Sequence, residues 1–98
     1  MAFKIVWTFN ARLDRKDIFS YWNNRNKSNV YSQKLNDLFN KHIESLLKFP
    51  NIGKRTNYRQ IRFLIVRDYQ IFYKIETQSI LILRIWDSRQ NPHKMKGL

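Results

Sequence analysis

Two segments of the C-terminal half of the chain, Lys54 to Arg62 and Arg84 to Arg89, carry lysine and arginine side chains that could bind an anion. Guanidinium and ammonium groups hold phosphate through charge-assisted hydrogen bonds, and such contacts fix a nucleic acid without reading its bases. Both segments should lead onto one β-sheet and converge there. We therefore predict a surface that binds a target molecule or its phosphates. It is made of Lys54, Arg55, Arg59, Arg62, Arg84 and Arg89.

Groups that could transfer a proton beside these cations are few. Chemistry on a bound phosphate would need a base, cations that hold the phosphate, and an acid for the leaving oxygen. His42 falls on the apolar stripe of a predicted helix, which favours a core or interface role. His93 follows Pro92 in a polar tail that places its ring poorly. The catalytic residues are therefore unknown, and the weak candidates are Arg62, Asp87, Arg89 and His93.

Arg84 has a second interpretation because it interrupts an otherwise apolar run. A cation inside such a run can be a core arginine held by a carboxylate, here Asp87 or Glu76. Asp87 itself could act as a base if it is buried, or it could fix Arg84 or Arg89 in position. The residue types alone leave these alternatives open.

The charge balance indicates an anionic partner. The 98 residues include 19 Lys and Arg against 7 Asp and Glu, a formal net charge of +12, and the excess is spread over both halves of the chain. Such a field attracts nucleic acid or an acidic protein. The length fits one domain, residues 1–98. No cysteine is present, which excludes disulfides, thiolate zinc sites and cysteine nucleophiles. We expect no metal or cofactor, no signal peptide or membrane span, and a cytoplasmic location.

The first half of the chain predicts a strand followed by two helices. Phe3–Phe9 is apolar, β-branched and aromatic, which is typical of a buried strand. Asn10 resembles an N-cap for a helix that runs to about Asn24, although Asp14 and Arg15 interrupt its apolar stripe. A polar connection leads to a second helix, from about Val30 to Lys48, whose apolar residues recur at helical spacing. Pro50 ends it.

The second half predicts three strands. Tyr58–Val66 and Tyr69–Glu76 alternate in polarity, with a tight turn at Arg67 and Asp68 between them. Ile80–Trp86 is nearly unbroken apolar sequence, as expected for a central strand that is covered on both faces. The predicted fold is α+β, in the order β-α-α-β-β-β. A helical hairpin packs on one side of a small, twisted, mostly antiparallel sheet.

Five short motifs in this order resemble the RelE/ParE superfamily of toxins from type II toxin–antitoxin modules. They are W-T at Trp7, I-x-x-Y-W at Ile18, F-P-N-I-G-K at Phe49, D-Y-Q-I-F-Y at Asp68 and L-R-I-W-D-S-R-Q-N-P at Leu83. No single motif is specific, but their order and spacing extend the resemblance over nearly the whole chain. It implies a growth-inhibiting toxin, of the kind associated with plasmid stabilisation, that an acidic antitoxin neutralises.

The resemblance leaves the cellular target open between two branches. RelE-like members are metal-independent endoribonucleases that cut messenger RNA on the ribosome, whereas ParE-like members inhibit DNA gyrase by binding. Arg89 matches a phosphate-contacting arginine of the nuclease branch. Gln70, however, stands where that branch usually has an arginine, and Trp86 and Met95 offer no counterpart to its C-terminal tyrosine or histidine.

These departures favour the gyrase-binding branch. The ribonuclease, and a nucleic-acid-binding module without toxicity, remain as alternatives, so enzyme activity is uncertain. No small-molecule substrate is implied. An antitoxin tail in such complexes lies along the toxin as a helix or an added strand. Phe19, Phe72 and Trp86 are candidate anchors for it if they are exposed, and core residues if they are not.

Overall fold

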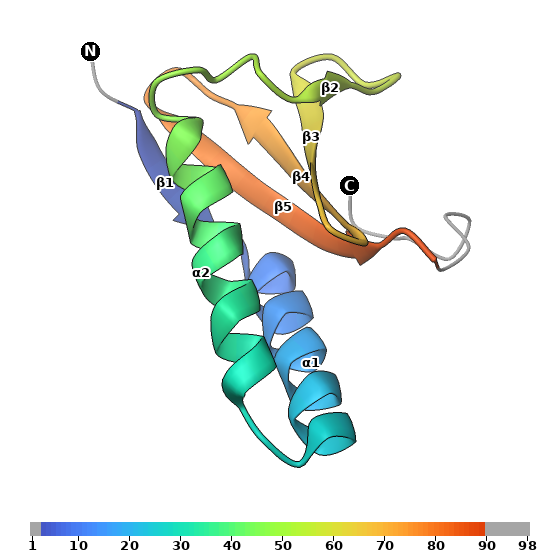
Figure 1. The fold of residues 1–98 in the computed structure, drawn as a ribbon. Helices are drawn as coiled ribbons and strands as arrows, with labels where there is room; N and C mark the ends of the chain where they lie inside the picture. The colour runs from blue at the N-terminus through green and yellow to red at the C-terminus, as the bar shows by residue number, and fades with distance from the viewer. Residues whose placement is uncertain (1–2, 90–98) are drawn as a thin grey trace.

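Two antiparallel helices pack on one face of a five-stranded sheet in the computed structural model, which describes residues 3–89 (Figure 1). The strands lie in the order β1-β5-β4-β3-β2. β1 runs parallel to β5, and every other neighbouring pair is antiparallel. The elements are β1 (Lys4–Trp7), α1 (Phe9–Asn26), α2 (Val30–Ser45), β2 (Lys54–Arg55), β3 (Ile61–Val66), β4 (Tyr69–Ile75) and β5 (Ser79–Asp87).

The predicted α+β fold and the order of its main elements are confirmed. β5 is paired on both sides along its first half, as its unbroken apolar sequence predicts, and Ile80 and Ile82 are fully buried. α2 presents Leu35, Phe39 and Ile43 to the core at helical spacing. None of the described helices is long and apolar enough to cross a bilayer.

The two polar residues that interrupt the apolar stripe of α1 both have partners in the fold. The Arg15 guanidinium lies 4.1 Å from the centre of the Trp7 ring, a cation–π contact. Asp14 faces β5, where its carboxylate accepts hydrogen bonds from the Arg84 side chain and from the backbone N–H of Ile85. The interrupted stripe therefore marks the side of α1 that binds the sheet through polar contacts.

Asp14 closes an edge that β1 leaves open. The pairing between β1 and β5 stops at Trp7 and Ile82, so the backbone of β5 beyond Ile82 has no strand on that side. A buried N–H without a partner costs about 1–3 kcal/mol. The Asp14 carboxylate supplies the missing acceptor to the N–H of Ile85 at 3.0 Å.

The predicted start of the first helix was wrong. The strand ends at Trp7 instead of Phe9, and Thr8, not Asn10, is the N-cap. The Thr8 hydroxyl accepts from the N–H of Ala11 at 3.2 Å and lies 2.8 Å from the carbonyl of Ile82, to which it donates. Thr8 caps because one hydroxyl serves both the helix and β5, a contact 74 positions away in the chain.

The structure also differs from the prediction at the end of α2, at the start of β3 and in one additional strand. α2 ends at Ser45, and turns rather than α-helix continue to Lys48. β3 begins at Ile61 instead of Tyr58, because Gln60 has a φ of 67°, a left-handed conformation that no strand contains. The two-residue strand β2 was not predicted, since a strand this short has no recognisable pattern. The turn at Arg67 and Asp68 is confirmed.

Replacing Asp14 by Ala should lower the free energy of unfolding by about 2–3 kcal/mol, because it removes the carboxylate that pairs with Arg84 and accepts from the N–H of Ile85. Chemical denaturation of the variant measures this. Asp17→Ala is the matched control, as Asp17 is an exposed aspartate of the same helix. An equal effect of both substitutions would contradict the assignment of a specific role to Asp14.

Candidate functional site

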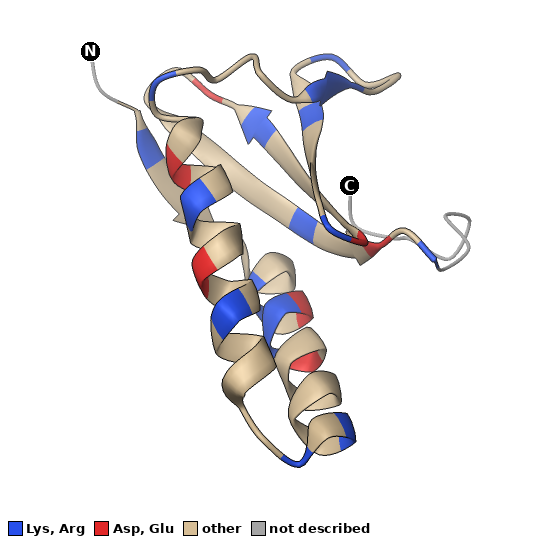
Figure 2. Ribbon diagram, in the orientation of Figure 1, with Lys and Arg blue, Asp and Glu red and all other residues tan. Residues whose placement is uncertain are grey.

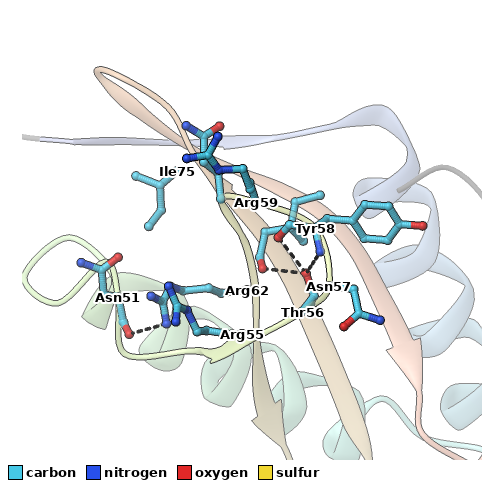
Figure 3. Close-up of a pocket in the computed structure, with 10 residues that line it drawn as sticks. Asn51, Arg55, Thr56, Asn57, Tyr58, Arg59, Arg62 and Ile75 are labelled. Atoms are coloured by element: carbon cyan, nitrogen blue, oxygen red, sulfur yellow. Dashed lines mark hydrogen bonds between the residues drawn. The ribbon is translucent and has the colours of Figure 1, made fainter.

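A polar hollow of about 710 Å³ opens between the loop that follows α2 and the loop that precedes β3 (Figure 3). Its lining holds three arginines together with amide, hydroxyl and apolar side chains. Among the described residues, no aspartate, glutamate or histidine lines it. The lining residues are Asn51, Arg55, Thr56, Asn57, Tyr58, Arg59, Gln60, Ile61, Arg62 and Ile75. We call this hollow the arginine pocket.

The arginine pocket brings together three of the six predicted target-binding residues. Arg55 and Arg62 are directly opposite each other in the β2–β3 ladder, and Arg59 belongs to the loop before β3. Lys54 precedes Arg55 in β2, opposite Phe63, so it projects to the other face of the ladder. Figure 2 shows the basic positions of β2 and of the start of β3 at the same end of the sheet.

Tyr73 fixes one wall of the arginine pocket from inside the core. Its ring is fully buried, and its hydroxyl donates to the carbonyl of Pro50 at 2.6 Å and accepts from the N–H of Gly53 at 3.0 Å. Burial raises the pKa of this phenol above its ordinary value. The hydroxyl therefore stays protonated and serves as a bridge that holds the segment from Pro50 to Gly53.

Gly53 is required at this wall because the backbone passes so close to Tyr73. A Cβ at residue 53 would lie 2.6 Å from the Tyr73 hydroxyl oxygen and 2.9 Å from the carbonyl oxygen of Phe63. Both distances are shorter than a carbon can approach without displacing its neighbour. The sequence alone does not show this packing role, because it depends on a tyrosine 20 positions away.

Arg62 binds the same wall through its guanidinium. One terminal nitrogen, Nη1, donates to the carbonyl of Gly53 at 2.9 Å and to the carbonyl of Asn51 at 3.2 Å. The positive charge is thereby held at the floor of the pocket by neutral acceptors, which do not cancel it. Arg62 thus has a structural function in addition to the charge for which it was predicted.

The opposite wall is a loop closed by its own hydrogen bonds. The Thr56 hydroxyl lies 2.8 Å from the carbonyl of Ile61 and accepts from the N–H of Tyr58 at 3.1 Å. The N–H of Ile61 donates back to the carbonyl of Tyr58. Gln60 adopts its left-handed conformation inside this loop. Backbone strain of this kind is retained only where surrounding contacts enforce it, and it recurs at functional sites.

Arg84 does not join the arginine pocket, and its predicted partners were wrong. It pairs with Asp14 of α1, with 2.7 Å between the Arg84 Nε and an Asp14 carboxylate oxygen, and not with Asp87 or Glu76. Both side chains are largely buried, at 17% and 16% exposed. The hydrogen bond to Asp14 raises the pKa of Arg84 further. Arg84 is therefore a structural arginine that attaches α1 to β5.

Asp87 and Arg89 form a separate ion pair at the other end of the sheet, 2.7 Å apart at their closest atoms. Asp87 is aligned with Tyr69, which is opposite Val66, whereas Arg62 is four positions earlier in β3. At about 3.3 Å per residue, roughly 13 Å separates the two ends. The two basic segments therefore lead onto one sheet, as predicted, but their six cations do not meet at one place. The alternative in which Asp87 fixes Arg89 is confirmed.

The remaining proton-transfer candidates contribute nothing to the arginine pocket. The bond from Arg89 holds the pKa of Asp87 below its ordinary value, so this carboxylate stays ionised. His42 lies on α2, half-buried, with its Nδ1 2.9 Å from the carbonyl oxygen of Leu38. Gln70 pairs with Trp86 and Ile65 in the sheet. His93 lies outside the residues that the structure describes.

The three candidate antitoxin anchors are not exposed. Phe72 and Trp86 are 7% and 8% exposed, and Phe19 stacks on Phe39 with 6.2 Å between the ring centres. Tyr58 is exposed instead, at 64%, on the rim of the arginine pocket. Its exposure could not be predicted, because it depends on the strand starting at Ile61. Over residues 3–89, no group of three or more potential metal ligands comes together.

One family model matches nearly the whole chain, and one solved structure shares its fold. The family model described as "ParE toxin of type II toxin-antitoxin system, parDE" matches residues 5–92. A solved structure, described as "Chromosomal ParDE TA system from P. aeruginosa", superposes with a TM-score of 0.72 at 17% sequence identity, over 85% of this chain and 92% of that chain. This likeness concerns the fold. No curated protein sequence matches the chain.

Replacing Tyr73 by Phe should loosen the wall of the arginine pocket, because the Pro50 carbonyl and the Gly53 N–H lose their shared partner. We expect a loss of about 1–3 kcal/mol in the free energy of unfolding. Amide hydrogen exchange at Gly53 should accelerate more than exchange in α2. Tyr31→Phe is the control, because it removes a hydroxyl from a partly buried tyrosine of α2 whose ring contacts Trp22. Unchanged exchange at Gly53 would contradict the bridging role.

The same tyrosine predicts a loss of stability in alkali. Folding raises the pKa of Tyr73, so the unfolded chain releases this proton first, and the stabilisation declines as pH rises above about 10. Denaturation midpoints of the wild-type protein should therefore fall above that pH. Tyr73→Phe, which cannot ionise, should fall less steeply. Parallel profiles for the two proteins would refute the contribution of Tyr73.

Proposed function

Because the chain belongs to the ParE toxin family of type II toxin–antitoxin systems, we propose that it stops growth by binding DNA gyrase in the cytoplasm. In this proposal the protein inhibits its target by surface complementarity and performs no covalent chemistry. An acidic antitoxin neutralises it.

The observation that carries this proposal is the composition of the arginine pocket. Its three arginines can hold an anion, but none of its lining residues is a carboxylate or an imidazole that could exchange a proton near neutral pH. RNA cleavage by a nuclease requires a group that transfers protons beside the phosphate, and a carboxylate or an imidazole is the usual one. A cationic site without them suits binding.

Three acid–base groups of the described sheet, two tyrosines and one aspartate, are already committed to structural contacts. Tyr69 accepts a hydrogen bond from the Trp22 indole at 2.8 Å, and burial raises the pKa of its phenol. Tyr73 bridges the wall of the arginine pocket, and the ionised Asp87 carboxylate is paired with Arg89. Each of these groups would have to abandon its partner before it could serve a reaction.

The antitoxin is proposed to be acidic because of the charge of this chain. A formal net charge of +12 over 98 residues gives a strong field, which accelerates association with a negatively charged protein. The solved structure of similar fold belongs to a ParDE TA system, which agrees with a toxin that works in a pair.

A ribosome-dependent ribonuclease is the second candidate, and one observation favours it. Tyr58 places a phenol hydroxyl on the rim of the arginine pocket, and its side chain is 64% exposed. A tyrosine beside arginines could take part in general acid–base catalysis. In this alternative the arginine pocket would receive the scissile phosphate, and no metal would be required.

Controlled expression with pulse labelling of DNA, RNA and protein distinguishes these functions. Gyrase binding predicts that DNA synthesis stops first and that cells form filaments while translation continues. Early arrest of translation would support the ribonuclease instead. Harmless expression of folded protein would overturn both proposals and leave a non-toxic nucleic-acid-binding module.

A purified system gives the corresponding direct measurement. The protein should inhibit DNA supercoiling by gyrase, and addition of an acidic antitoxin should restore the activity. Messenger RNA should remain intact in a cell-free translation reaction with the same protein. Tyr58→Phe should leave gyrase inhibition unchanged if Tyr58 has no catalytic role. Cleaved messenger RNA that Tyr58→Phe abolishes would exclude the binding-only mechanism.

A further inference from the structure

Two arginines of the arginine pocket are placed where their charges repel. Arg55 and Arg62 are direct partners in the antiparallel β2–β3 ladder, so their side chains leave the same face of the sheet from adjacent positions. Directly opposed residues have Cβ atoms about 4.5–5.5 Å apart, and like charges in such pairs are destabilising. Figure 3 shows the two side chains together near Asn51.

Nothing in the lining of the pocket compensates this repulsion. Arginine keeps its charge at every physiological pH. Neither Arg55 nor Arg62 forms an ion pair with any of residues 3–89, and Arg62 donates only to carbonyls. Arg59 adds a third positive charge to the same hollow. An anion bound between these groups would turn the repulsion into attraction.

We propose that the arginine pocket binds the phosphodiester backbone of a nucleic acid. Arg55 and Arg59 are exposed and contact the phosphates, while Arg62 positions the wall and adds its charge from the floor. This proposal does not rest on gyrase as the target. It concerns a ligand that the protein binds directly, and DNA and RNA are the two sources of the same chemistry.

The spacing of the cations favours a polymer over a single free anion. Arg59 lies apart from the Arg55–Arg62 pair in Figure 3, near Ile75, so the pocket has two centres of positive charge. A nucleic-acid backbone presents successive phosphates that can occupy both centres. One carboxylate of an acidic peptide is fully bound by one guanidinium fork and needs no second centre.

The rim of the pocket supplies the contacts that a nucleotide needs beside its phosphate. The Tyr58 ring is exposed, and an aromatic face next to cations stacks on a base without selecting its identity. Asn51, Asn57 and Gln60 add amide donors and acceptors for sugars and base edges. These features fit an unpaired stretch of nucleic acid better than a duplex.

Both walls of the site are held by internal hydrogen bonds. Tyr73 and Arg62 fix one wall, and the Thr56 hydroxyl closes the loop that forms the other. Binding therefore orders little new structure, which removes part of the entropic cost of association. The strained backbone at Gln60 agrees with a loop held in one functional conformation.

The test is fluorescence anisotropy of labelled single-stranded DNA, duplex DNA and RNA of equal length, titrated with the full chain. The double variant Arg55→Gln/Arg59→Gln should bind at least roughly tenfold more weakly than wild type at low salt. The slope of log affinity against log salt should decrease by about two, one unit for each phosphate that the variant no longer neutralises. Single-stranded probes should bind more tightly than the duplex.

The matched control is Arg12→Gln/Lys16→Gln, which removes the same charge from exposed positions of α1. It should retain nearly wild-type affinity and salt slope. Circular dichroism and the melting temperature confirm that each variant is folded. An equal loss in both double variants would overturn the proposal, because binding would then depend on net charge and not on the pocket.

Two further arms separate the possible ligands. Tighter binding of poly-glutamate than of nucleic acid, at equal chain charge, would overturn a phosphodiester site in favour of an acidic protein. Tyr58→Ala should weaken single-stranded binding with little change in the salt slope, because it removes stacking and no charge. Gyrase inhibition is measured separately with the same variants. Its absence would refute the proposed function without affecting the result for nucleic-acid binding.

Discussion

The contact between Asp14 and β5 determines how the helical hairpin sits on the sheet. β1 is too short to cover β5 along its whole length, and the strand carries an arginine where its outer edge becomes free. The Asp14 carboxylate of α1 pairs with this arginine and also satisfies the free edge, since it accepts from the Arg84 side chain and from the N–H of Ile85. The Thr8 hydroxyl donates to the carbonyl of Ile82. Together with the Asp14 carboxylate, it fixes α1 against β5 at two points.

This contact also decides what the basic residues of the sheet can do. Arg84 is neutralised inside the fold, and Arg89 is neutralised by Asp87 at the far end. Among the six cations predicted to act together, Arg55, Arg59 and Arg62 are those that share one hollow without a carboxylate. The positive charge of the chain is spread evenly, but its capacity to bind an anion is concentrated where no acidic side chain opposes it.

The shape of that hollow depends on the core. Tyr73 is buried in β4, and its hydroxyl reaches the loop after α2, where only glycine leaves enough space beside it. Arg62 binds the same loop from β3. A segment that would otherwise be a loose connection is thus tied to two central strands. The fold uses no carboxylate for this anchoring, and the pocket therefore keeps its positive charge.

The sequence alone determined the main elements and their order, because hydrophobic periodicity and turn residues act over a few positions. The two helices, the turn at Arg67 and the buried β5 were all recognisable from such local patterns. The family resemblance, which the match to the ParE toxin model confirms, rested on motifs of the same short range. The residue types also included the three arginines that line the hollow among the predicted binding residues, and the binding of an anion there stays a prediction.

Only the tertiary structure decided which charged residues act together. In the sequence, Asp14 only interrupts an apolar stripe. Its role depends on Arg84, 70 positions away. Thr8 caps α1 because it also reaches β5, and Gly53 is needed because of Tyr73. Each of these roles is a contact between residues far apart in the chain, and a local pattern carries no information about which distant partner a side chain will meet.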